Sequence, residues 1–329
     1  MPSNHTIRRL PLSMMLFTVL GFIVATSISN AEEPDLEKAQ SVFDLKMESD
    51  YSDSGADNCL RCHDTDSDYP ATKIFFTAHG NQNDKNSPMA QFQCESCHGP
   101  AGEHSVRRVP KGEEREAMID FTHQNMPVVE MNKICSSCHQ NSDDHFSGSS
   151  HEIMNVACTD CHKVHDSEHG VLKKQNQIEI CGTCHIEQKL SSNKFSSHPL
   201  DFQGQMGCVD CHSPHATDND HQLAQESVND TCFSCHAEKR GPFVWEHEPA
   251  TDNCANCHSS HGSNHADMLV QKAPFLCQNC HSSQGHPAIA YDRPGINNRS
   301  ESMLLGRSCM NCHGQIHGSN HPSGSTLQR

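Results

Sequence analysis

The hydrophobic residues of this chain form one long run and are otherwise dispersed. The run covers residues 10–25, follows a pair of arginines and leads to the small-residue stretch Ser29-Asn30-Ala31. This order is typical of a secretory signal peptide, so we expect residues 1–31 to direct export and to be removed after Ala31. The alternative is an uncleaved membrane anchor, because the run approaches the length that spans a bilayer.

The rest of the chain is polar, and neither helical nor strand periodicity continues for long. Residues 32–58 form a polar amino-terminal segment, in which residues 36–47 predict a short helix. Further short helices are predicted at residues 112–120 and 228–235. No stretch alternates apolar and polar residues as a half-buried strand does, and no later run is long enough to cross a bilayer. The pattern predicts a mostly irregular chain with short α-helices and almost no β-sheet.

Composition leaves the expected core unexplained. Hydrophobic residues make up 34% of the 329 residues and aromatic residues 5%, with a single Trp. A chain this poor in apolar side chains is expected to be disordered unless another group supplies the buried surface. The formal net charge is -17, and it becomes more negative when Arg8 and Arg9 are removed. Nucleic acid is therefore not expected as a partner, because phosphate binding requires clustered Lys and Arg.

One motif, Cys-x-x-Cys-His, occurs ten times and uses all 20 cysteines. Two cysteines separated by two residues and followed by histidine form the attachment signature of c-type haem, in which both thiols bond to the haem and the histidine binds its iron. Zinc sites, iron–sulfur clusters and disulfides do not require a histidine after every second cysteine. The motifs predict ten covalently bound haem c groups, which form the core.

The predicted covalent sites are Cys59, Cys62, Cys94, Cys97, Cys135, Cys138, Cys158, Cys161, Cys181, Cys184, Cys208, Cys211, Cys232, Cys235, Cys254, Cys257, Cys277, Cys280, Cys309 and Cys312. The predicted proximal iron ligands are His63, His98, His139, His162, His185, His212, His236, His258, His281 and His313.

Flanking histidines show that the repeat is a unit of two motifs. The motifs at Cys158, Cys208 and Cys254 have histidines on both sides, whereas the motifs that follow them have none in this register. A repeat in which each unit contacts mainly its neighbours predicts an elongated body. A weak boundary divides residues 59–190, the first five-haem half, from residues 191–329, the second, within one continuous array.

The flanking histidines also match the number of second axial ligands that ten haems need. They are His79, His104, His151, His165, His198, His215, His247, His261, His286 and His317. Which histidine serves which iron stays open, because a ligand can come from a neighbouring unit. Other histidines are rivals, namely His123, His145, His169, His221, His265 and His321. Methionines such as Met126, Met154 and Met268 follow no motif register, so we expect them to fill gaps.

Two histidines on each iron predict an electron carrier, not an enzyme, because no position remains for a substrate. One alternative is a multihaem reductase of nitrite, hydroxylamine or tetrathionate, which needs one open haem site. Another is a soluble periplasmic carrier that stores electrons.

The strongest family resemblance lies in residues 240–287 and 306–321. These carry Trp245-Glu-His247, His261-Gly-Ser-Asn-His265 and Gln315-Ile-His317-Gly-Ser-Asn-His321. They resemble the doubled Cys-x-x-Cys-His repeat and, more closely, the DmsE/MtrA family of decahaem cytochromes. The likeness covers essentially all of the chain after the signal peptide.

This resemblance implies a periplasmic protein associated with the outer membrane, where it threads a β-barrel of the MtrB type. It implies electron donors among inner-membrane and periplasmic cytochromes. It also implies delivery to a surface multihaem cytochrome or a terminal reductase, and finally to metal oxides or dimethyl sulfoxide. In iron oxidisers the same device runs inward.

Overall fold

The computed structural model describes residues 49–67, 71–106, 108–140, 146–166, 168, 170–200, 204–215, 219–281, 309–322 and 324–327. They belong to one unit, Asp35–Arg329. The predicted signal peptide, the predicted helix at residues 36–47 and the candidate ligand His286 lie outside the described residues, as do His145 and His169.

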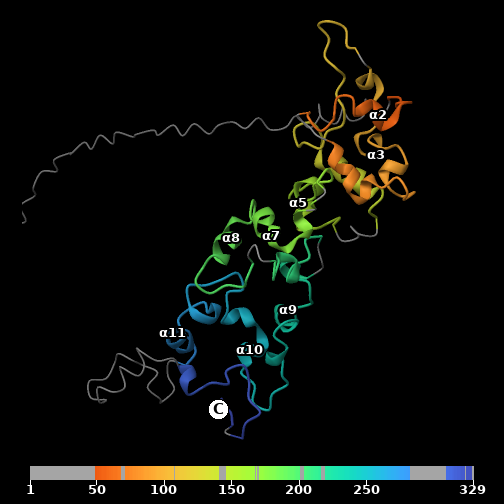
Figure 1. The fold of residues 1–329 in the computed structure, drawn as a ribbon. Helices are drawn as coiled ribbons and strands as arrows, with labels where there is room; N and C mark the ends of the chain where they lie inside the picture. Colours follow the sequence, from red (N-terminus) through yellow and green to blue (C-terminus); the bar gives the residue numbers. More distant parts are fainter. Residues whose placement is uncertain are drawn as a thin grey trace, which may run out of the picture. The chain divides into compact units, whose positions relative to one another are not determined.

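Short helices joined by irregular chain make up the described fold (Figure 1). The α-helices are α2 (Gly55–Cys59), α3 (Glu95–His98), α4 (Val128–Ser136), α5 (Ser150–Ile153), α6 (Cys158–Cys161), α7 (Lys174–Cys181), α8 (Ile186–Ser192), α9 (Val228–Phe233), α10 (Glu248–Asp252) and α11 (Ala273–Gln278). The 3-10 helices are η1 (Thr72–Phe76), η2 (Ala78–Gly80), η3 (Pro88–Ala90), η4 (Gly102–Ser105), η5 (Gly170–Leu172), η6 (Cys208–Asp210), η7 (Asp220–Gln222), η8 (Ala237–Lys239), η9 (Cys254–Asn256), η10 (Ala266–Met268) and η11 (Cys309–Asn311).

Extended pairing within the described ranges is limited to isolated bridges, such as Ser196 with Ser263 and Trp245 with Ser319. The predicted mixture of short helices with almost no sheet is confirmed. None of the helices in this part of the chain is long and apolar enough to cross a membrane.

Secondary structure repeats with a period of two motifs. In odd-numbered motifs the first cysteine lies at or near the end of a helix, as Cys181 does in α7 and Cys232 in α9. In even-numbered motifs a helical turn begins at or just after the first cysteine, as at Cys158 in α6 and Cys254 in η9. The two-motif unit inferred from flanking histidines therefore also describes the backbone.

Of the two predicted helices that fall on described residues, one is confirmed and one is wrong. Residues 228–233 form α9, whose first turn is capped by the Ser227 hydroxyl, which accepts from the backbone N–H of Asp230. Residues 113–120 are irregular, not helical. The reason lies in their carbonyl groups: those of Glu116 and Ile119 accept hydrogen bonds from histidine side chains and are not available for helical bonds.

Buried amide side chains hold the third, fifth and seventh motifs to the even-numbered motifs that follow them. Asn229 in α9 accepts from the backbone N–H of Cys254 at 2.7 Å and donates to two carbonyls of α10. Asn132 in α4 accepts from the N–H of Cys158 at 2.9 Å in the same way. Gln177 in α7 is in the corresponding place before the motif that begins at Cys208, and its amide accepts from the neighbouring Val209 N–H. These contacts fix the two motifs that they join relative to each other.

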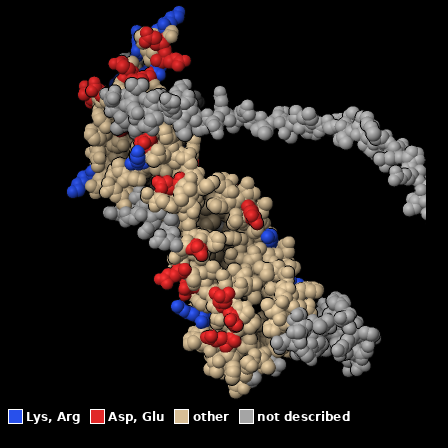
Figure 2. Space-filling model, turned by 180° about the vertical axis from the view of Figure 1, so that it is seen from behind, with Lys and Arg blue, Asp and Glu red and all other residues tan. Residues whose placement is uncertain are grey.

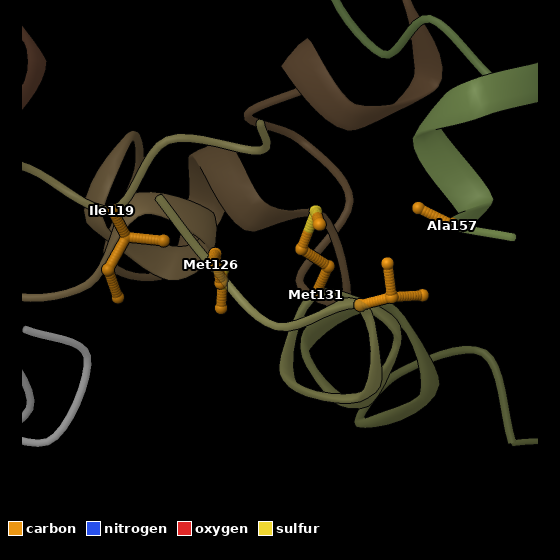
Figure 3. Close-up of a cluster of buried hydrophobic side chains, with 5 residues drawn as sticks. Ile119, Met126, Met131 and Ala157 are labelled. Carbon is orange, nitrogen blue, oxygen red and sulfur yellow. The ribbon is translucent and has the colours of Figure 1, made fainter. Parts of the chain in front are cut away.

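The buried hydrophobic cluster is small. It consists of Ile119, Met126, Val128, Met131 and Ala157, with Met126 and Met131 almost fully buried (Figure 3). Met126 therefore fills space in the protein, as expected for a residue outside the motif register. A cluster of this size is a minor core for so long a chain, so most of the buried surface must come from another source.

Charged side chains are sparse on the face drawn in Figure 2. Acidic groups lie there in several places, and the few Lys and Arg side chains are separate from one another. This face offers no basic patch of the kind that binds nucleic acid.

Candidate haem-binding sites

Each Cys-x-x-Cys-His motif forms the same tight turn. In all ten, the backbone N–H of the histidine donates to the carbonyl of the first cysteine at 2.8–3.0 Å. This bond closes the loop between the two thiols and brings the histidine close to them, as attachment to one flat macrocycle requires. None of the 20 cysteines forms a disulfide. The described residues also hold no group of three or more His, Cys, Asp or Glu arranged for a metal ion.

Successive motifs approach one another through alternate cysteines. The side chains of Cys232 and Cys254, the first cysteines of the seventh and eighth motifs, lie next to each other. At the next junction the neighbouring side chains are second cysteines, Cys257 and Cys280. The same alternation occurs elsewhere, with first-cysteine contacts at Cys59–Cys94, Cys181–Cys208 and Cys277–Cys309 and second-cysteine contacts at Cys97–Cys138, Cys161–Cys184 and Cys211–Cys235.

The motifs line one continuous cavity of about 5660 Å³. Pockets for single small molecules usually measure about 300–1,000 Å³, so this volume suits a row of macrocycles. Its lining includes the cysteines and histidines of all ten motifs.

Inside this cavity the imidazole rings stand in pairs. Each pair contains one motif histidine and one flanking histidine, with ring centroids 5.8–6.4 Å apart. The pairs are His63–His104, His98–His165, His139–His79, His162–His215, His185–His151, His212–His261, His236–His198, His258–His317 and His281–His247.

The separation suits two rings that bind one metal from opposite sides. A histidine–metal bond of about 2.0 Å and about 1.1 Å from nitrogen to ring centre, counted on both sides, give about 6.2 Å between centroids. Nine of the ten flanking candidates are in these pairs, and the tenth, His286, is outside the described residues. Of the rivals, His123, His221 and His265 are in none of these pairs, and His123 instead bonds Asp160 at 2.9 Å.

Burial favours the neutral, metal-binding form of several of these rings. It lowers the pKa of His98, which is the most enclosed, and also the pKa values of His165, His261 and His317. Desolvation penalises the protonated imidazole, and only the neutral ring offers a lone pair to iron.

Backbone carbonyls fix which nitrogen carries the proton. The Nδ1 atom of His258 donates to the Asp267 carbonyl at 2.7 Å, and that of His98 donates to Ile119 at 2.7 Å. A carbonyl only accepts, so Nδ1 holds the proton and Nε2 is free to face a metal. The sequence gives no signal for these acceptors, because any residue type supplies a carbonyl.

Comparisons with known proteins agree with this geometry. A model described as "Doubled CXXCH motif" matches residues 201–241 and 247–286. Models described as "Cytochrome c-type protein NrfB-like" and "Cytochrome c554 and c-prime" match residues 94–184 and 25–99. Multiheme cytochrome MtrA of Shewanella baltica is 46% identical over 301 residues, which cover 89% of this chain and 87% of that protein.

The repeated turns, the paired imidazoles and the three matching models define a multihaem c-type cytochrome, which binds haem c and carries electrons. Identity at this level over most of both chains makes the assignment narrower. The chain belongs to the MtrA family of multihaem cytochromes.

Proposed function

We propose that the chain carries ten haems, one per motif, and that each iron is held between two histidines. The observation that carries this proposal is the set of imidazole pairs at 5.8–6.4 Å, each combining one motif histidine with one flanking histidine. The tenth pair would join His313 to His286. With both axial positions occupied, the array transfers electrons and leaves no iron open to substrate.

The residues of the chain then have separate tasks. Haem c supplies an iron that gains and loses one electron. The thiols would fix the position of each macrocycle, and the motif turn would hold the proximal histidine within reach of its iron. The opposing histidine would complete the same ligand set in both oxidation states, so that little would rearrange on electron transfer. Contacts between successive motifs keep neighbouring sites close enough for electrons to hop along the row.

Haem stoichiometry and spin state test this proposal. The pyridine haemochrome absorbance and the intact mass should give ten haems per chain. The electron paramagnetic resonance (EPR) spectrum of the oxidised protein should contain only low-spin ferric signals, and carbon monoxide should not bind the reduced protein. A high-spin signal or carbon monoxide binding at one haem would instead support a reductase.

We further propose that the protein works in the periplasm as part of an outer-membrane conduit with a β-barrel of the MtrB type. The family membership and the signal-like amino terminus support this location. Electrons would arrive from inner-membrane and periplasmic cytochromes. They would leave to a surface cytochrome or terminal reductase, or to metal oxides or dimethyl sulfoxide. Co-purification with a barrel from detergent-solubilised outer membranes is the expected result, whereas free protein in periplasmic extracts would favour an electron store.

A further inference from the structure

In most of the described pairs the two rings are held differently. In seven pairs one ring donates its Nδ1 proton to a backbone carbonyl, and the opposite ring makes no such bond within the described part of the chain. In even-numbered motifs the held ring is the motif histidine, as in His98, His212 and His258. In the pairs of odd-numbered motifs the held ring is the flanking histidine that faces the motif histidine. These rings are His104, His151, His198 and His247.

The held flanking rings bond to the chain next to a neighbouring pair. His198 donates to the carbonyl of Ser260, the residue before His261. His151 and His247 repeat this contact with the carbonyls before His215 and His317. Each bond therefore links two pairs. It joins the flanking ring that faces an odd-numbered motif to the segment that carries the flanking ring facing the preceding even-numbered motif.

The held motif rings depend on unusual backbone. His212 donates to the carbonyl of His221 and His258 to that of Asp267, and both acceptors have left-handed φ values of 57° and 56°. The next residues, Gln222 and Met268, are also left-handed, with φ of 53°. Residues with a Cβ rarely adopt this conformation, and two in succession at equivalent places in two units are a local strain of the kind found at functional sites.

The motifs themselves hold these strained turns. The Ser259 N–H donates to the Met268 carbonyl at 2.7 Å, and the Val270 N–H donates to the Cys257 carbonyl at 2.9 Å. The unit of His212 has the same two bonds. The Asp267 side chain is exposed, so this residue acts through its backbone.

We propose that the left-handed turns at His221–Gln222 and Asp267–Met268 are positioning elements that aim a carbonyl at the proximal histidine, and so lower the reduction potential of that haem and fix the plane of the ring. The inference rests on the proposed axial ligation. An imidazole whose Nδ1–H is bonded to a carbonyl donates more electron density to its metal, and this stabilises ferric iron. The ring planes of the pairs at these two motifs, 12° and 14° apart, are the most nearly parallel of the nine.

Substitutions at Asp267 test this in the full-length haem-loaded protein. Asp267→Val should disfavour the left-handed turn and withdraw the carbonyl, because a β-branched residue tolerates positive φ poorly. We expect the midpoint potential of a single haem to rise and the EPR signal of one nearly parallel pair to change, with all haems still low-spin. Asp267→Gly loses the same side chain but accepts the turn, so it should keep the wild-type reduction curve.

A graded series keeps the test decisive if Asp267→Val fails to bind ten haems. In Asp267→Asn and Asp267→Ala the midpoint potential of that haem should shift according to how well each residue tolerates positive φ. The shift should be smaller for Asn than for Ala. The positioning role would be overturned if Asp267→Gly and Asp267→Ala had the same reduction curve, whether that curve matched the wild type or was shifted from it. Failure of the ligation proposal looks different, because the wild-type protein would then itself show high-spin iron.

Discussion

The imidazole rings of His212 and His261 face each other with centroids 6.1 Å apart and planes 12° apart. His212 belongs to the sixth motif, and His261 follows the eighth. A ring from one two-motif unit is therefore completed by a ring from the next.

Replacement of His261 by alanine should open one iron. The motif ring His212 would keep its haem, but the opposite axial position would lose its ligand. We expect one high-spin ferric signal and carbon monoxide binding at one haem, with the haem count unchanged. His265→Ala is the matched control, because it removes a histidine from the same segment that is in no described ring pair; it should leave all haems low-spin. The reverse result would mean that the pairing is wrongly assigned.

A methyl group at Gly262, the residue after His261, should destabilise the protein through the backbone. Gly262 has φ of 124°, and a Cβ there would press into the Ser191 carbonyl oxygen. Strained backbone of this type costs about 1–3 kcal/mol, and the collision adds to it. Gly112→Ala is the control, because it has φ of 95° but nothing within 4 Å. In denaturant unfolding followed by Soret absorbance, Gly262→Ala should lose more stability than Gly112→Ala; equal losses would exclude the collision as the cause.

Loss of the Asn229 amide should loosen one two-motif unit. Asn229→Ala removes the acceptor of the Cys254 N–H and the donor to two α10 carbonyls. Buried groups left without partners cost about 1–3 kcal/mol, so the unfolding midpoint should fall accordingly. Asn264→Ala, at an exposed amide with no described side-chain bond, should change stability by less than about 0.5 kcal/mol. Similar losses in both variants would contradict the role of Asn229.

Ring-plane angles predict more than one class of low-spin haem. The planes differ by 68° in His139–His79 and 76° in His185–His151, but by only 12–21° in four other pairs. Steeply crossed rings leave two iron d orbitals nearly equal in energy, and this gives a highly anisotropic EPR signal. Nearly parallel rings separate the orbitals and give a rhombic spectrum. We expect both signals in the oxidised protein, and His151→Ala should weaken the anisotropic one. A single spectral class would contradict these orientations.

The sequence predicted those parts of the site that depend on residue type. Cysteine spacing identified the motifs, and the register of flanking histidines selected the residues that the structure pairs. Their role as axial ligands stays a prediction, as do the elongated shape and the boundary between residues 190 and 191. The His162–His215 pair spans this boundary.

Partner choice could not be read from the sequence, because in all nine described pairs the flanking histidine lies beside a motif other than the one that contains its partner. The carbonyl acceptors were also missed. At His221 and Asp267 no glycine marks the left-handed turn, and it is the surrounding backbone hydrogen bonds that impose it. The helix predicted at residues 112–120 is wrong for a related reason. Two carbonyls of this irregular segment accept hydrogen bonds from histidine rings, and the sequence does not show those contacts.

The interleaving of the ring pairs limits how such a chain can change in length. The loop between His212 and His261 encloses the motifs of His236 and His258, and the loop between His247 and His281 begins before the first loop has closed. Deletion of one motif would strand a ring at each side of the cut. Deletion of a complete two-motif unit would bring equivalent histidines into register and restore every pair. We therefore expect viable relatives and engineered versions to gain or lose haems two at a time, so that the number of haems in the array changes in steps of two.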